Sequence, residues 1–308
     1  MRKLRIVLPV FIALAALLPA LRTSAQTPGE PPPAEQGAQR MASREELTQL
    51  LAPIALYPDP LLSQVLMAST YPLEIVEADR WLRKHPRLKP DALDAALQSQ
   101  DWDPSVKSLC HYPPVLAEMD ANLARTTRLG NAFLAQQRDV MDVIQELRRK
   151  ARQQGTLADS AKERVEVRDT AVVIEPAQPG VVYVPYYNPL VVYGPWWYPA
   201  YPPYVWFPGI GASFGLGFSA GFYVGPAIVG WSFFDWPAFA VGVNYGLAVP
   251  FVRGGYFGRG AAAREFWAHD PVHRRGVAYA NAYTARRFGQ GAALAAPSGA
   301  ARGFAGPA

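Results

Sequence analysis

Two histidines in the C-terminal part of the chain are spaced as metal ligands often are. His269 and His273 are four positions apart, and on a helix this spacing places two imidazoles on one face. Asp270 and Pro271 form a helix start between them, so we expect His269 to precede any helix. No cysteine or obvious third ligand is near them, and a closed zinc site needs four ligands. We therefore expect loop or surface histidines, keep metal binding as the minor alternative, and predict no cofactor.

Three aspartates of the N-terminal half resemble the carboxylate pairs that cleave glycosides. These are Asp59, Asp101 and Asp103, and glycoside hydrolysis needs two carboxylates at a defined separation. Asp59 and Asp103 each precede a proline. Asp-Pro is a common helix start, because the Asp side chain caps free N–H groups and Pro in the first turn loses no hydrogen bond that it could have made. We therefore expect helix caps at these positions. Because the sequence also lacks a phosphate-binding glycine loop and an H-E-x-x-H motif, enzymatic activity is unsupported.

A block of aromatic residues and prolines at 181–208 has the composition of a binding surface. It holds eleven aromatic residues and seven prolines in 28 positions, with no formal charge. Aromatic faces stack on sugar rings, Tyr and Trp favour membrane interfaces, and a proline-rich strap covering an apolar groove of the helical domain is a third interpretation. The binding hypothesis rests on Tyr193, Trp196, Trp197, Tyr198, Tyr201 and Trp206.

The first residues indicate export. A basic n-region with Arg2, Lys3 and Arg5 precedes an apolar stretch, and Thr23-Ser24-Ala25 presents small residues before a cleavage point. This order is typical of a secretory signal peptide, which we assign to residues 1–25. Residues 26–42 are rich in Pro, Gly, Gln and Glu and are expected to form a disordered linker.

An all-α domain is predicted at 43–157. Ser43 and Glu46 form a capping box at its start, and prolines punctuate the following sequence where short helices begin. Its last helix is predicted from Phe133, Val140 and other apolar residues on one face, with Arg148 and other basic residues favourable at the C-terminal end. Gly155 is expected to end it.

Beyond this domain the chain changes character twice. Short runs rich in valine predict a small antiparallel β segment at 158–194. Residues 195–252 form an aromatic, Pro- and Gly-rich region of low complexity that is uncharged apart from Asp235. Within it, glycines four apart and a length sufficient to span a bilayer make membrane insertion of 209–234 one hypothesis. An Arg/Gly/Ala-rich tail follows at 253–308. Because the helical domain precedes a separate β segment, the predicted fold class is α+β.

Charge is distributed unevenly over the exported chain. Removing the signal peptide leaves 26 basic and 25 acidic residues, of which 176–308 hold eight arginines and three acids. Such asymmetry suggests different surroundings for the two halves. Because the chain is expected to be exported, nucleic acid is not a predicted partner. A membrane surface or an envelope protein fits best, and cell-wall glycan is the alternative.

Several long motifs resemble one bacterial exported family, named domain of unknown function 3300. They include QLLAPIALYPDPLLSQVLMASTYPLEIVEADRWL, DWDPSVKSL, VVYVPYYNPLVVYG and HDPVHRRGVAY, in this order. The resemblance covers roughly residues 44–195 and returns at 267–290. It implies a periplasmic or outer-membrane-associated protein of Gram-negative type, with no established activity and no catalytic residues to transfer.

These observations favour a non-enzymatic protein of the cell envelope. We expect a structural, scaffolding or interaction role, with attachment to a membrane or partner through the apolar aromatic and Gly-rich region. The alternatives are a peptidoglycan-binding module and, with less support, an unrecognised hydrolase. The sequence does not indicate an oligomeric state.

Overall fold

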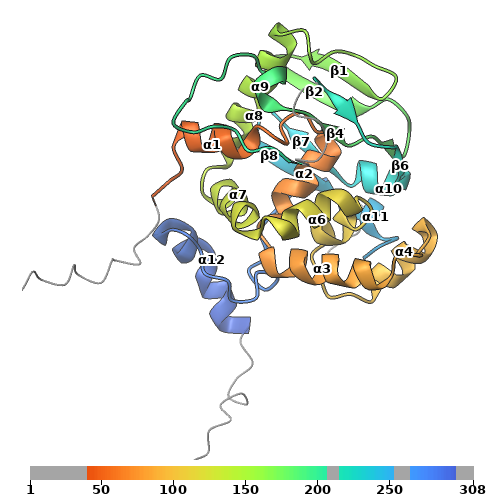
Figure 1. Ribbon diagram of the computed structural model, residues 1–308. Helices are drawn as coiled ribbons and strands as arrows, with labels where there is room; N and C mark the ends of the chain where they lie inside the picture. Colours follow the sequence, from red (N-terminus) through yellow and green to blue (C-terminus); the bar gives the residue numbers. More distant parts are fainter. Residues whose placement is uncertain (1–39, 207–214, 253–263, 296–308) are drawn as a thin grey trace, which may run out of the picture. The chain divides into compact units, whose positions relative to one another are not determined.

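The computed structural model describes residues 40–206, 215–252 and 264–295 (Figure 1). The predicted signal peptide, most of the predicted linker, residues 207–214 of the segment considered for membrane insertion, and parts of the predicted tail lie outside the described residues. The described part is a mixed α+β fold with a helical N-terminal part, as predicted. Its first helices are α1 (Arg44–Leu51), α2 (Asp59–Ala68), α3 (Pro72–Lys84), α4 (Pro90–Gln98), α5 (Pro104–Leu109), α6 (Pro113–Ala121), α7 (Leu123–Ala135) and α8 (Gln137–Gln153).

Proline-marked starts define most of these helices. Each of α2 to α6 carries proline in its first turn, where the missing N–H costs no intrahelical bond. The capping box of α1 is confirmed, since Ser43 accepts from the Glu46 amide and Glu46 accepts from the Ser43 amide. Asp103 caps α5 through the Ser105 amide at 2.8 Å, as predicted.

Two local predictions are wrong. Asp59 does not cap α2, because Pro58 occupies the cap position and the Asp59 side chain turns into the core. The single long helix expected from Phe133 to the basic residues is divided at Gln136, whose φ of −140° interrupts it. The side-chain amide of Gln136 accepts a hydrogen bond from the Ala42 N–H at 2.7 Å and donates one to the Ala42 carbonyl at 2.9 Å. Gly155 follows the C-cap residue of α8, as predicted, and has a φ of 70°, a conformation that favours glycine.

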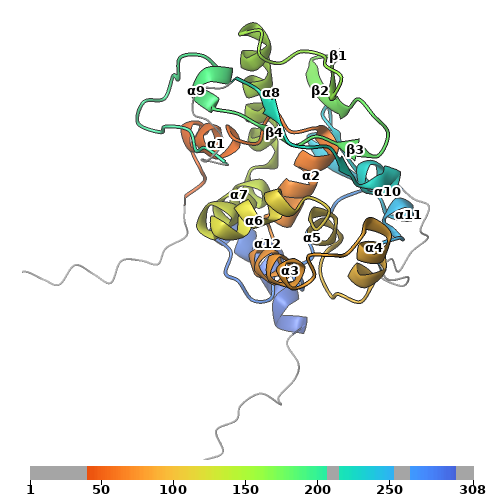
Figure 2. The same cartoon turned by 45° about the vertical axis from the view of Figure 1, so that its right-hand side comes forward.

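The predicted β segment begins with a hairpin. Strands β1 (Glu163–Arg168) and β2 (Ala171–Pro176) pair antiparallel from Glu163↔Pro176 to Arg168↔Ala171. The two-residue turn contains Asp169 at a φ of 53°, and such turns match the twist of the flanking strands. The hairpin packs on α8, as both views show (Figures 1 and 2).

The remaining strands pair across long stretches of sequence. Strand β3 (Val181–Val182) pairs with β6 (Phe222–Tyr223), and β4 (Pro185–Tyr186) pairs with β5 (Gly217–Phe218). A three-stranded sheet has the order β7 (Ser232–Asp235), β8 (Ala240–Asn244), β9 (Arg264–Phe266). The other helices are α9 (Pro189–Val192), α10 (Gly225–Gly230), α11 (Tyr245–Ala248) and α12 (Ala282–Ala295).

The apolar region contributes to the same core as the helices. One cluster of buried side chains runs from Leu47 in α1 to Val252, and Trp231 and Phe251 within it are 1% and 0% exposed. Residues 215–235 form short strands and α10 where one long helix was considered. Over the described ranges, no helix has both the length and the apolar character that crossing a membrane requires.

Candidate functional site: a cleft lined by β2, β7 and α8

A buried arginine joins the helices to the hairpin. Arg148 of α8 is 0% exposed, and its guanidinium pairs with the Asp59 carboxylate at 2.5 Å. It also donates to the carbonyl oxygens of Ala55, Tyr57 and Val172 at 2.8 to 2.9 Å. These bonds satisfy a charge that would otherwise be costly inside a protein.

Asp59 has a second set of partners on the other side. The Trp236 indole N–H donates to Asp59 Oδ2 at 2.9 Å, and the Arg148 guanidinium lies 5.2 Å from the Trp236 ring centre. Burial raises the pKa of Asp59, while the charge and hydrogen bond of Arg148 and the Trp236 bond oppose that rise. Asp59 therefore connects α2, α8 and the residue that follows β7.

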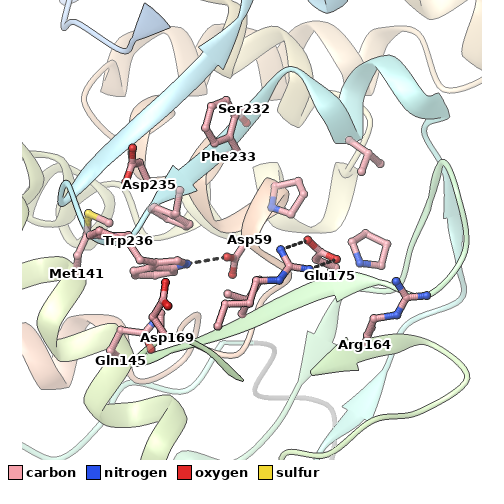
Figure 3. Close-up of a pocket in the computed structure, with 18 of the residues that line it drawn as sticks. Asp59, Met141, Gln145, Arg164, Asp169, Glu175, Ser232, Phe233, Asp235 and Trp236 are labelled. Atoms are coloured by element: carbon pink, nitrogen blue, oxygen red, sulfur yellow. Dashed lines mark hydrogen bonds and ion pairs between the residues drawn. The ribbon is translucent and has the colours of Figure 1, made fainter. Parts of the chain in front are cut away.

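Asp59 and Trp236 of this network line an open cleft of about 1110 Å³, and with the Arg148 that holds them we call them its floor. Figure 3 shows Trp236 and Asp59 bonded to one another between the side chains of β2 and those of β7. The apolar lining includes Met141, Val173, Phe233, Phe234 and Phe239. Phe234 stacks on Trp236 with ring centres 4.4 Å apart, which fixes the aromatic wall.

Charged residues surround this apolar lining, and some neutralise one another. Arg168 bonds Glu175 at 2.9 Å and Glu166 at 2.9 Å, and Arg164 lies 3.8 Å from Glu166. Within the part of the chain that the structure describes, Asp142, Asp169, Asp235 and Arg149 form no ion pair. The cleft thus combines an aromatic wall with charged side chains that form no ion pair, although Arg44 attracts Asp142 from outside the lining. Such an arrangement is suited to binding.

The aromatic residues predicted to bind lie mostly against the helices. Tyr193 is 1% and Trp206 4% exposed, while Trp196, Trp197, Tyr198 and Tyr201 are half-buried. The Tyr193 hydroxyl donates to the carbonyl of Ala52 at 2.8 Å. Trp196 donates to the carbonyl of Tyr201 at 2.9 Å, and the Lys150 ammonium lies 4.6 Å from the Trp197 ring centre.

We call residues 193–206 the strap. Its later half is also fixed, since Gln49 bonds the Pro202 carbonyl at 2.7 Å and Arg128 bonds the Tyr204 hydroxyl at 3.1 Å. Arg125 lies 5.7 Å from the Trp206 ring centre. Of the three interpretations of the aromatic block, a strap packed on the helices is the one that these contacts confirm. Glycan binding by its half-buried rings stays a prediction.

The two C-terminal histidines are buried, not at the surface, and both pack against Tyr71, but their polar partners differ. His273 bonds Glu74 of α3 at 2.7 Å, whereas His269 stacks on Tyr71 with ring centres 5.1 Å apart and contacts the Tyr279 hydroxyl. Burial, aided by Arg274 and His273, lowers the pKa of His269 to about 3. Across the described ranges, no group of three or more His, Cys, Asp or Glu side chains is arranged to hold a metal ion.

The same C-terminal segment is anchored by an arginine. Arg274 is 1% exposed and donates to the Thr70 carbonyl and to Asn131 Oδ1, at 2.9 and 2.8 Å. Arg275 bonds Glu77 of α3 at 2.7 Å. These contacts hold residues 269–275, whose motif belongs to the resemblance described above, against α3 and α7.

The residues that build the cleft floor were not predicted as a site. Asp59 was interpreted as a helix cap and Arg148 as a favourable charge at a helix end, while Trp236 was not singled out. One signal was present in the sequence, because Asp59 is the sole charge in the apolar stretch LAPIALYPDPLLSQVLM. A lone charge in such a run favours a buried, paired side chain over a solvated one.

Comparison with known proteins identifies the family of the chain. The profile of a family described as "Protein of unknown function (DUF3300)" matches residues 43–252, and the chain belongs to this family. This confirms the resemblance found in its motifs. The family description names no activity, ligand or partner.

A particular relative is the uncharacterized protein YacH of Escherichia coli (strain K12). The two sequences are 39% identical over 246 residues, a match that covers 70% of this chain and 40% of that protein. The chain therefore spans less than half the length of this relative. No solved structure matches the chain.

Proposed function

We propose that this chain is a non-enzymatic protein of the Gram-negative cell envelope, exported to the periplasm or the outer-membrane surface, with a scaffolding or interaction role. It attaches to an envelope protein or a membrane surface through the cleft. Export is supported by the basic n-region, the apolar stretch and the small residues before Gln26. The composition of residues 195–252 supports attachment.

This proposal rests on which part of the chain forms one wall of the cleft. Most residues between 229 and 239, including Phe233, Phe234 and Trp236, line the cleft, and all of these come from the apolar aromatic and Gly-rich region. Much of that region is packed into the core, so its contact with a partner falls to the side chains that it presents in the cleft. Phe233 and Phe239 are half-buried and thus partly accessible.

A binding role fits the bonding of the charged groups on the cleft floor. Asp59 is engaged by Arg148 and Trp236, and Gln145 exchanges two hydrogen bonds with the backbone of Val172. These polar side chains hold the walls together. A rigid cleft of this kind favours association because little conformational freedom is lost when a partner binds.

Fractionation of cells that produce the full chain tests the proposal. We expect a mature protein that begins at Gln26 and sediments with the envelope, and we expect Phe233→Asp to release it because a charge then replaces part of the apolar wall. Leu73→Asp is the matched control, since Leu73 is 41% exposed on α3 and does not line the cleft. Equal sedimentation of both variants, or retention of the protein in the cytoplasm, would contradict the proposal.

A further inference from the structure

The charge left over in the cleft indicates what kind of partner it accepts. The charged residues that line it are Asp59, Asp142, Arg149, Arg164, Arg168, Asp169, Glu175 and Asp235. Asp59 is neutralised from within the core by Arg148. Glu175 and Glu166 together neutralise Arg168 and Arg164 on the hairpin.

Among the lining residues, three carboxylates and one guanidinium then remain without an ion pair. Arg138 beside the cleft, and Arg44, which attracts Asp142 without pairing with it, reduce this negative excess but do not cancel it. Asp142 on α8, Asp169 in the hairpin turn and Asp235 at the end of β7 make no ion pair in the described ranges, and neither does Arg149. The three carboxylates come from three different elements that border the cleft. The accessible charge is therefore net negative, although the region supplying one wall is almost uncharged.

Apolar side chains occupy the space between these carboxylates. Met141 on α8, Val173 on β2 and Phe233 on β7 line the cleft together with Phe234 and Trp236. An aromatic face is itself attractive to a cation placed over it, and in the free protein Arg138 already lies 3.9 Å from the Phe239 ring centre beside the cleft. A ligand that fits must present an apolar group and a positive charge close together.

We propose that the cleft binds a segment of a partner protein in which lysine or arginine side chains flank an apolar or aromatic side chain. This deepens the proposed function and rests on it, because it names the chemistry of the partner. The apolar side chain packs against Phe233 and Trp236, and the flanking cations face Asp142 and Asp235. An acidic segment is rejected by the same carboxylates, so charge supplies specificity while the apolar contact supplies affinity.

Fluorescence anisotropy on the mature chain, residues 26–308, tests this directly. The probes are a short labelled peptide with lysines on both sides of a tryptophan, and the same peptide with glutamates in place of the lysines. We expect the lysine peptide to bind at least about fivefold more tightly, and the difference to shrink as salt is added. Equal affinity, preference for the glutamate peptide, or no binding of either peptide would overturn the proposal.

Two variants locate the interaction. Asp142→Asn and Asp235→Asn are each expected to weaken binding of the lysine peptide by about two- to fivefold, the usual effect of one exposed charge pair. Asp139→Asn, on α8 but outside the lining, is expected to leave affinity unchanged. If all three variants behave alike, the cation does not bind in the cleft. Envelope release by Phe233→Asp does not depend on these peptides, so the proposed function can stand when the partner chemistry fails.

Discussion

Arg148 and Asp59 form an ion pair inside the core, with side chains 0% and 9% exposed and Nη1 2.5 Å from Oδ1. The pair lies where α2, α8 and β2 meet, and the Trp236 indole completes it from the segment after β7. Because the cleft walls come from these same elements, the pair fixes the cleft as well as the core.

Breaking this pair is expected to be costly. Arg148→Met leaves the Asp59 carboxylate buried without its partner, and removing one member of a buried pair typically costs about 3–5 kcal/mol in the free energy of unfolding. Urea denaturation of residues 26–308 measures this loss. Arg149→Met is the control. Arg149 is the exposed neighbour of Arg148, so its replacement should change the free energy of unfolding by less than about 0.5 kcal/mol. Similar midpoints for the two variants would show that the pair does not stabilise the fold.

Helix α7 approaches α2 closely at a glycine. A Cβ atom added to Gly130 would lie 2.1 Å from the carbonyl oxygen of Ser69, at the end of α2. Because backbone atoms cannot move aside cheaply, Gly130→Ala should destabilise the protein by about 1–3 kcal/mol. A Cβ atom added to Gly289 in α12 would meet no atom of the described residues within 4 Å outside its own stretch of helix, so Gly289→Ala should be neutral or stabilising by about 0.5–1 kcal/mol. Thermal unfolding of both variants checks the contrast, and a neutral Gly130→Ala would contradict the packing.

The His273–Glu74 pair predicts a pH dependence of stability. Burial lowers the pKa of His273, but the hydrogen bond and charge of Glu74, with Asp103 and Asp270 nearby, outweigh it and raise the pKa above 6.5. The pKa of Glu74 is also raised, in its case by burial, which disfavours the charged carboxylate. A raised folded-state pKa gives stability that is complete below the unfolded value and is lost as pH rises through the folded value.

His273→Gln should therefore cost most at pH values below about 6.5 and progressively less above it. The charged groups that face the pair are Asp103, Asp270 and Arg275, with Lys107 on α5. His269→Gln gives the opposite trend: its folded pKa of about 3 lies below the unfolded value, so the wild-type ring opposes folding as pH falls below about 6.5, and the cost of removing it should shrink there. Urea midpoints at several pH values provide the measurement. A His273 effect that is constant or grows with pH would contradict the ion pair.

The strap provides a test of the glycan alternative. Trp196 and Trp197 pack on one another with ring centres 4.8 Å apart, so the double change Trp196→Ala/Trp197→Ala should lower stability by several kcal/mol. If the strap does not bind glycan and the partner binds in the cleft, the folded variant should be retained on purified peptidoglycan as much as the wild type is. Retention lost without loss of helical circular dichroism would favour glycan binding by the strap.

Local signals predicted the helical part well. Ser43 with Glu46, Asp103 with Pro104, and Gly155 each specify a helix end through bonds to nearby residues, and the structure confirms all three. The hairpin was also predictable because its two strands adjoin in sequence. Asp59 followed the same Asp-Pro pattern as Asp103 but differs in function, because its partner Arg148 is 89 positions away.

The cleft could not be predicted for the same reason. Its lining spans Asp59 to Phe239, and no local pattern indicates that β7 lies opposite β2. The pairing of β3 with β6 across some forty intervening residues likewise depends on tertiary packing. Composition did indicate that residues 195–252 were unusual, yet it could not separate side chains buried in the core from those that line the cleft.

Cross-linking from the cleft in living cells tests the central claim most directly. A photoreactive phenylalanine analogue at position 233 preserves the ring on the cleft wall, and the same analogue at Leu73 on α3 serves as the control. We predict a covalent adduct with an envelope protein from position 233, absent from position 73 and diminished by Asp235→Asn. No adduct from position 233, or the same adducts from both positions, would contradict a cleft that binds the partner.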